Sequence, residues 1–306
     1  MALPNYASPL ERIWHYTYLV ICALIFLFLI APILVVIPLS FNAEPYFTFT
    51  PKMLALDPEG YSLRWYDKLL TFGMINPDAP RDLSWWADVW ENSKWVNAAK
   101  NSFIIGFFAT ILATGFGTLA ALGLSRPEMP FRRAIMAILI SPMIVPIIIT
   151  ATGLFFFYSK IQISHWGIPY LGIILAHATL GIPFVIITVT ATLVGFDHSL
   201  NRAAANLGAD PRTTFFRVTM PLILPGVISG ALFAFVTSFD EVVVVLFVGA
   251  LDEQTIPRQM WNGIREQISP AILAVATILV IVSIALLTTV ELLRRRSERL
   301  RGITPR

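Results

Sequence analysis

The stretch Arg202-Ala-Ala-Ala-Asn-Leu-Gly208-Ala-Asp210-Pro211 decides the fold, because it interrupts an otherwise very apolar chain with a short polar-flanked segment. Glycine tolerates the left-handed conformation of a helix C-cap, so a helix over residues 199–207 is expected to end at Gly208. Asp210 suits the N-cap of a following helix, and Pro211 suits its first position. A helix-turn-helix of this kind presents a surface for a partner to bind.

On either side of this segment the chain has the composition of a membrane protein. Its 306 residues are 56% hydrophobic and 13% charged, with a mean hydropathy of +0.71, which a water-soluble domain would not show. About 20 apolar residues are needed to cross about 30 Å of hydrocarbon. Six stretches reach this length, so we predict an all-α helical bundle that forms a single membrane domain over residues 1–306. The predicted spans are residues 16–41, 101–124, 134–157, 170–195, 222–248 and 271–290.

The distribution of basic residues predicts the orientation of these spans. With the N-terminus inside, thirteen of the 22 Lys and Arg residues fall on the cytoplasmic side and nine outside. Both termini are then cytoplasmic, residues 42–100 form a long external loop, and residues 196–221 form a cytoplasmic loop whose second helix is expected to end at Pro221. Residues 16–41 are too long for the core of a signal peptide and are expected to remain as the first span.

Motifs of catalysis are missing from the sequence. It contains no G-x-x-x-x-G-K-[ST] phosphate loop, no H-E-x-x-H or C-x-x-C pattern, and no G-x-S-x-G pattern. We therefore predict a protein that is not an enzyme and that binds no metal or cofactor itself. If it moves a solute uphill, the energy source is on another chain.

The segment from Arg202 to Asp210, with Phe216-Arg217-Val218 and two later prolines, resembles the cytoplasmic EAA loop in membrane subunits of binding-protein-dependent ABC importers. That resemblance implies a permease fold in a bacterial inner membrane and a coupling helix that docks on an ATP-hydrolysing subunit. The implied partners are a homologous second permease, two ATPase subunits that bind ATP and Mg, and an external solute-binding protein. The implied docking residues are Arg202, Ala203, Ala204, Leu207, Gly208, Ala209 and Asp210. Arg202 stands where the family has glutamate, so any ion pair made there is rearranged or absent.

Further motifs resemble the spermidine/putrescine branch of this family, specifically its second permease subunit. They are Ser238-Phe239-Asp240-Glu241-Val242-Val243, the segment from Gly263 to Pro270, Ala274-Val275-Ala276-Thr277, and Leu175-Ala176-His177 with Pro183-Phe184-Val185. The resemblance implies a polyamine cargo. Related subfamilies import other organic cations, amino-acid derivatives or iron complexes, so a different solute is an alternative.

Asp240 and Glu241 are the candidate residues of the translocation path. Both fall well inside the fifth predicted span, where ionisable side chains are costly and are usually functional. Adjacent residues of one helix point about 100° apart, so one carboxylate is expected to line the path while the other pairs across the subunit interface. Thr237 lies one turn earlier on the same face and offers a hydroxyl. The alternative is a structural ion pair or a gate contact with the sister subunit.

The loop between the fifth and sixth spans is predicted to face outside. In related importers this loop reaches toward the binding protein, which makes its charged residues candidate contacts, although a polar loop can also merely connect two helices. These residues are Asp252, Glu253, Arg258, Arg265 and Glu266.

Other polar and aromatic residues are interpreted structurally. Trp85, Trp86, Trp90 and Trp95 favour an amphipathic helix at the membrane surface over a cage for an amine. His177 is expected to be hydrogen-bonded between helices. The prolines expected to kink the bundle are Pro142, Pro146 and Pro183.

Two alternatives come from other functional classes. A channel or a gradient-driven secondary transporter would need no ATPase, but the helix-turn-helix and the lack of internal repeats disfavour it. A membrane-embedded enzyme would need a nucleophile with its base, or a metal-ligand set, and neither is recognisable in the sequence.

Overall fold

A computed structural model describes residues 8–126, 128–197, 199–266 and 269–300. Within these ranges the chain is helical, with turns and one isolated bridge between Asn42 and Tyr61. The all-α prediction is therefore confirmed. Four helices are long and apolar enough to cross a membrane: α1 (Pro9–Leu39), α5 (Lys94–Leu124), α8 (Leu171–Val194) and the continuous run Pro211–Asp240.

The predicted span over residues 134–157 is not one straight helix. It is divided into α6 (Arg132–Ile144) and α7 (Ile147–Lys160), which meet at an angle of 101°. Val145 is extended, because the residue before a proline is pushed out of the helical region, and Pro146 follows it. Counting this broken pair as one span gives up to five spans, and the described apolar part of α14 (Ala271–Leu300) is shorter, covering Ala271–Ala285.

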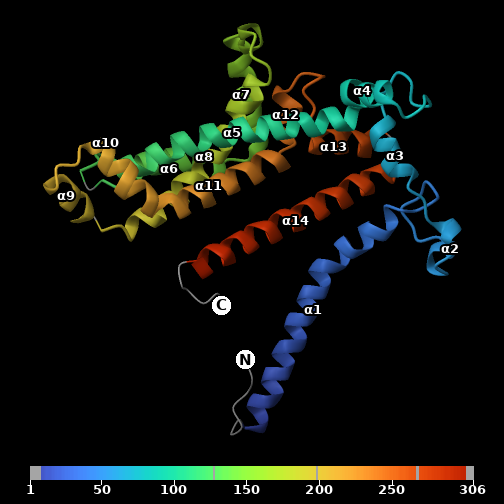
Figure 1. The fold of residues 1–306 in the computed structure, drawn as a ribbon, viewed down its shortest axis with the longest axis horizontal. Helices are drawn as coiled ribbons and strands as arrows, with labels where there is room; N and C mark the ends of the chain where they lie inside the picture. Colours follow the sequence, from blue (N-terminus) through green and yellow to red (C-terminus); the bar gives the residue numbers. More distant parts are fainter. Residues whose placement is uncertain (1–7, 127, 198, 267–268, 301–306) are drawn as a thin grey trace. The chain divides into compact units, whose positions relative to one another are not determined.

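The chain divides into two compact units, residues 1–72 with 263–306 and residues 73–262 (Figure 1). In the first unit α1 presents its apolar length outward, and Leu39 is its buried residue. The connection that follows holds α2 (Pro51–Leu54), a 3-10 turn (Pro58–Gly60) and α3 (Arg64–Thr71), which packs on α14. Trp65 Nε1 donates to the carbonyl of Asn42 at 2.7 Å and fixes α3 to the chain after α1.

The core of the second unit is the bundle of α5, α8 and α11 (Met220–Asp240) (Figure 1). Its buried residues include Ala113, Val185, Val189, Ile223 and Ala234. Two glycines set the close approach of these helices. A Cβ atom built on Gly117 would lie 2.6 Å from Cβ of Val185, and one built on Gly226 would lie 2.2 Å from Oγ1 of Thr192. Small residues at helix contacts are typical of packing in membranes, where close van der Waals contact drives association.

The predicted end of the second loop helix at Pro221 is wrong. After α9 (Ser199–Asn206), α10 (Pro211–Thr214) passes through one π-helical turn (Phe215–Thr219) directly into α11. The N–H of Met220 bonds the carbonyl of Phe215, five residues back. The wider π turn relieves the clash that the Pro221 ring would make with the preceding turn of an α-helix, so the helix continues.

Candidate functional site

The turn between α9 and α10 forms as the sequence predicts. Gly208 has φ +86°, its N–H bonds the carbonyl of Ala205 at 2.9 Å, and the N–H of Ala209 bonds the carbonyl of Ala204 at 3.0 Å. This is the Schellman pattern of a glycine C-cap. Asp210 then caps α10 by accepting from the N–H of Thr213 at 3.0 Å. The Thr213 hydroxyl, followed by this N–H, lowers the pKa of the Asp210 carboxyl.

The predicted docking residues lie on this turn with their side chains largely free. Arg202, Ala203 and Asp210 are exposed, and Leu207 is 89% exposed at the tip. Ala204 and Ala209 are half-buried, since their backbones make the cap. The sequence prediction did not include Phe216 among them, although it is 65% exposed on the π turn. Two exposed apolar side chains on a polar turn suit a partner's cleft.

The fifth predicted span is broken where its carboxylates lie. α11 ends at Asp240, Glu241 is extended with φ −76° and ψ 126°, and α12 (Val243–Val248) begins two residues later. The predicted geometry of both carboxylates on one helix is therefore wrong. At the break, Glu241 Oε1 accepts from the N–H of Val244 at 2.9 Å, so that the Glu241 side chain caps the start of α12.

This break separates Glu241 from the other two residues predicted to line the path, which both lie on α11. Glu241 is buried and engaged as a cap, Thr237 is half-buried, and Asp240 is exposed at the end of α11. The last carbonyls of α11 also lack helical partners, and the negative end of the helix dipole points toward Asp240. Asp240 therefore lies beside the negative end of α11, and it stays a candidate residue of the translocation path.

His177 on α8 is hydrogen-bonded between helices, as predicted. It is 1% exposed, and its Nδ1 lies 2.7 Å from the Ser238 hydroxyl. This contact joins α8 to the last turn of α11.

The loop after α12 folds back onto the bundle, which changes the interpretation of its charged residues. Arg258 lies on α13 (Ile256–Glu266) and is buried, and its Nη1 donates to the carbonyls of Val245 at 2.9 Å and of Gly249 and Ala250 at 3.1 Å. Burial lowers the pKa of Arg258, while the charge of Glu253 opposes this shift. Arg258 is thus the C-terminal cap of α12, and the predicted surface role does not fit its burial.

Glu253 is likewise engaged within the chain. Its carboxylate accepts from the N–H groups of Tyr170 and Ala250, both at 3.0 Å. Nδ2 of Asn101 on α5 donates to the carbonyls of Asp252 at 3.1 Å and Gln254 at 3.0 Å. The Asp252 side chain remains exposed, as does that of Arg265, and the side chain of Glu266 lies outside the described residues.

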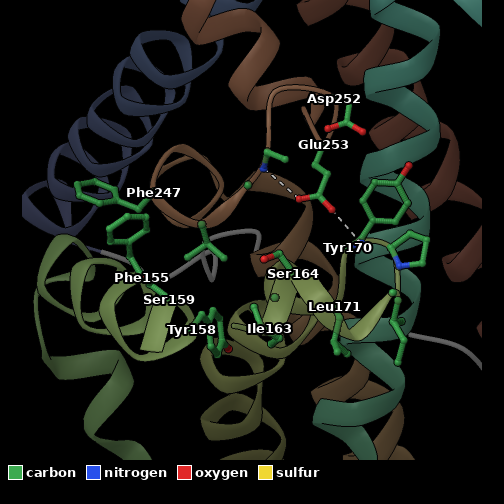
Figure 2. A pocket seen from close by; sticks show the side chains of 17 residues that line it. Phe155, Tyr158, Ser159, Ile163, Ser164, Tyr170, Leu171, Phe247, Asp252 and Glu253 are labelled. Carbon is green, nitrogen blue, oxygen red and sulfur yellow. Dashed lines mark hydrogen bonds between the residues drawn. The ribbon is translucent and has the colours of Figure 1, made fainter. Parts of the chain in front are cut away.

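A cavity of about 680 Å³ opens beside this loop (Figure 2). Asp252 and Glu253 lie on one side of it, and Phe155, Tyr158 and Phe247 lie across from them. Carboxylates and aromatic rings around one space suit an organic cation. The cavity had no sequence signal, because its walls come from the end of α7 with the segment that leads into α8, and from the end of α12 with the segment that follows it, which only the fold brings together.

The described part of the chain contains no candidate metal site, because no three His, Cys, Asp or Glu side chains lie close enough together there to hold an ion.

Comparison with known proteins gives the family. Residues 113–301 match the model of the binding-protein-dependent transport system inner membrane component. The chain belongs to this family. A binding-protein-dependent transport component of the inner membrane is a part of a transporter and not an enzyme, which confirms both the resemblance and the non-enzyme prediction.

Several relatives of this transport component cover nearly the whole chain. It is 30% identical to the spermidine/putrescine transport system permease protein PotC of Haemophilus influenzae, over 90% of this chain and 95% of that one. It is 28% identical to PotC of Escherichia coli K12, over 89% and 91% of the two chains. It is also 30% identical to the putrescine transport system permease protein PotI of that organism, over 90% and 88%.

A solved structure shares the fold. It is the crystal structure of a bacterial ABC transporter involved in the import of the acidic polysaccharide alginate, with a TM-score of 0.66 and 16% identity over 94% of this chain and 99% of that one. This likeness shows the permease fold of an ABC importer.

Proposed function

We propose that this chain is one of two permease subunits of an ABC importer for a polyamine, spermidine or putrescine. The observation that carries the proposal is the identity of about three residues in ten to PotC and PotI along nine-tenths of the chain. The complete importer would add a homologous permease, two ATPase subunits holding ATP and Mg, and an external binding protein.

The proposed topology has six spans with both termini in the cytoplasm. The six are α1, α5, the broken pair α6 and α7, α8, α11 with α12, and α14. The counts of basic residues support this side assignment, and it places the 196–221 loop in the cytoplasm.

The 196–221 loop is the proposed coupling element. Its support is the rigid doubly capped turn that exposes Leu207 at the tip, with Arg202 and Ala203 beside it. A surface that converts ATPase closure into movement has to be stiff, and both caps stiffen this turn.

Asp240 is the proposed cargo-path residue of this chain. A polyamine carries two or more positive charges and has to shed much of its hydration to pass the middle of the bilayer. A fixed carboxylate beside the negative end of α11 lowers that barrier, and it acts most strongly where the local dielectric constant is low. Among the outer-loop residues, Asp252 and Arg265 keep exposed side chains for binding-protein contact.

Reconstituted transport tests this function. The four-component complex in proteoliposomes, with ATP inside and the binding protein outside, should accumulate radiolabelled spermidine or putrescine, and complexes lacking ATP or the binding protein should not. Competition by unlabelled amino-acid derivatives or other organic cations reports a different cargo. Uptake by this chain alone without ATP would contradict the importer and support a gradient-driven transporter.

A further inference from the structure

The cavity beside the loop after α12 has the size and the charge of a small-molecule site (Figure 2). Its volume of about 680 Å³ lies within the range of about 300–1,000 Å³ that is typical of ligand pockets. All of its walls belong to the second unit. The charged residues among those that line it are Asp252 and Glu253, so the lining is acidic.

Glu253 is held in place without a ligand. Its Oε1 accepts from the N–H of Tyr170 and its Oε2 from the N–H of Ala250, both at 3.0 Å (Figure 2). Each oxygen keeps a further lone pair, so the carboxylate can accept more hydrogen bonds. Because the two backbone bonds already fix the side chain, a cation that binds it costs little additional side-chain entropy.

The basic residues of this region do not cancel the charge of the lining. Arg258 is near enough to Glu253 to offset part of its charge, but its Nη1 donates to carbonyls at the end of α12 and it does not line the cavity. Lys94 lines a neighbouring cavity of about 380 Å³, which shares Asp252 with this one. One guanidinium beside two carboxylates leaves the space with a net negative charge.

The Tyr158 hydroxyl is a buried polar group on the opposite wall. Tyr158 lines the cavity from α7 and is 7% exposed. Among the residues that the structure describes, none hydrogen-bonds this hydroxyl. A buried hydroxyl without a partner lowers stability, and a bound ligand or water accounts for such a group. Its oxygen is therefore an open acceptor for a ligand in the cavity.

We propose that this cavity binds the primary ammonium group of an aliphatic amine. The N–H groups of an ammonium need acceptors, which Glu253 and Tyr158 supply from the two walls. In the view of Figure 2, the Ser164 side chain lies between them and adds a hydroxyl. The rings of Phe155 and Phe247 suit both the methylene chain of the amine and, through cation–π contact, its charge.

Two sources carry this chemistry, a free polyamine and the headgroup of phosphatidylethanolamine. The assignment to a cargo amine rests on the proposed polyamine function. The cavity would then hold the cargo at a site apart from Asp240, since Asp240 does not line it.

Photocrosslinking locates the bound amine directly. A putrescine analogue with a diazirine on its carbon chain is irradiated with the assembled complex in phosphatidylcholine and phosphatidylglycerol nanodiscs, without binding protein or ATP. Mass spectrometry should find crosslinks within residues 155–172 or 247–253. Unlabelled putrescine should compete severalfold better than choline, which has no N–H donor, or butane-1,4-diol, which has no charge. Crosslinks absent from both segments, or equal competition by choline, would overturn the proposal.

Variants separate binding from folding. Tyr158→Phe removes only the unpartnered hydroxyl, so it should lower crosslinking severalfold without lowering the melting temperature. Asp252→Asn removes a lining charge and should also lower crosslinking. The matched control is Asp78→Asn, an exposed carboxylate before α4 (Leu83–Asn92) that does not line the cavity, and it should have no effect. A Tyr158→Phe complex that loses stability and keeps full crosslinking would show a structural hydroxyl and contradict the site.

The lipid composition distinguishes the two sources. If phosphatidylethanolamine in place of phosphatidylcholine suppresses crosslinking in the cavity, the ammonium site is confirmed and its occupant is the lipid headgroup; unchanged crosslinking gives the free amine. Polyamine uptake by the four-component complex without crosslinks in this cavity would overturn the site and leave the proposed importer standing. Crosslinks in the cavity without polyamine uptake would support the site and contradict the proposed cargo.

Discussion

At the scale of single residues, Gly208 is a position where the backbone conformation favours glycine. Its φ of +86° excludes most side chains, yet a Cβ atom there would meet nothing within 4 Å. Gly208→Val should therefore act through backbone strain alone, at about 1–2 kcal/mol. We expect lost uptake and uncoupled ATP hydrolysis with the complex still assembled, whereas Gly208→Asn, which tolerates this conformation, should retain uptake. Normal transport by the valine variant would show that the 196–221 loop does not couple ATP hydrolysis to transport.

The Asp210 cap gives the same loop a pH dependence. The Thr213 hydroxyl and N–H lower the Asp210 pKa in the folded chain, so the cap stabilises α10 above the unfolded carboxyl's pKa of about 3.9. Its contribution is lost as the pH falls through the lower folded value. Hydrogen exchange at residues 210–214, corrected for intrinsic rates, should lose protection in this acidic range. Asp210→Asn also caps but does not titrate, so it should show no such transition.

The two adjacent carboxylates should separate into a transport role and a structural role. Asp240→Asn removes an exposed charge, and we expect reduced polyamine uptake per assembled complex with unchanged thermal stability. Glu241→Ala removes the α12 cap and should destabilise the protein by about 1 kcal/mol, while Glu241→Gln, which keeps an acceptor oxygen, should lose less. Full uptake by the Asp240→Asn complex would exclude this carboxylate from the path.

At the scale of elements, α12 is a six-residue helix held by a side chain at each end, Glu241 and Arg258. Arg258→Ala removes the charged donor that three carbonyls share and should cost about 1.5–3 kcal/mol, the range for hydrogen bonds to charged groups. A lowered melting temperature and faster hydrogen exchange over residues 243–250 would report it. If the Arg258→Ala variant keeps its stability but binds the binding protein more weakly, Arg258 contacts the binding protein as the sequence predicted.

The elements that sequence predicts well here are those fixed by neighbouring residues. The Gly208 turn and the Asp210-Pro211 helix start depend on bonds within five residues, and they form as expected. The break at Glu241 was missed because hydropathy cannot register which carboxylate turns back to cap a helix. Arg258 was misplaced for a related reason, since its carbonyl partners are set by the fold of the whole loop. The helix end predicted at Pro221 was wrong because the π turn before this proline lets the helix continue.

At the scale of the whole molecule, the proposed topology is testable from outside the cell. In a Cys22→Ser background, a membrane-impermeant thiol reagent should label cysteines introduced at Asp78 and Asp252 in intact cells. Cysteines at Glu128 and Glu298 should react only after the membrane is permeabilised. The basis is the excess of basic residues in short cytoplasmic segments. Labelling of position 128 from outside would overturn both the orientation and the cytoplasmic place of the 196–221 loop.

The continuous helical run from Pro211 to Asp240 makes the proposed coupling loop and the proposed cargo-path carboxylate two ends of one rod. Its 30 residues measure about 45 Å at about 1.5 Å per residue. A rod of that length tilted by about 10° at one end moves its other end by about 8 Å. A small rotation imposed on Pro211 would thus reach Asp240 as a displacement comparable with the width of a helix, less whatever bending the π turn Phe215–Thr219 absorbs on the way.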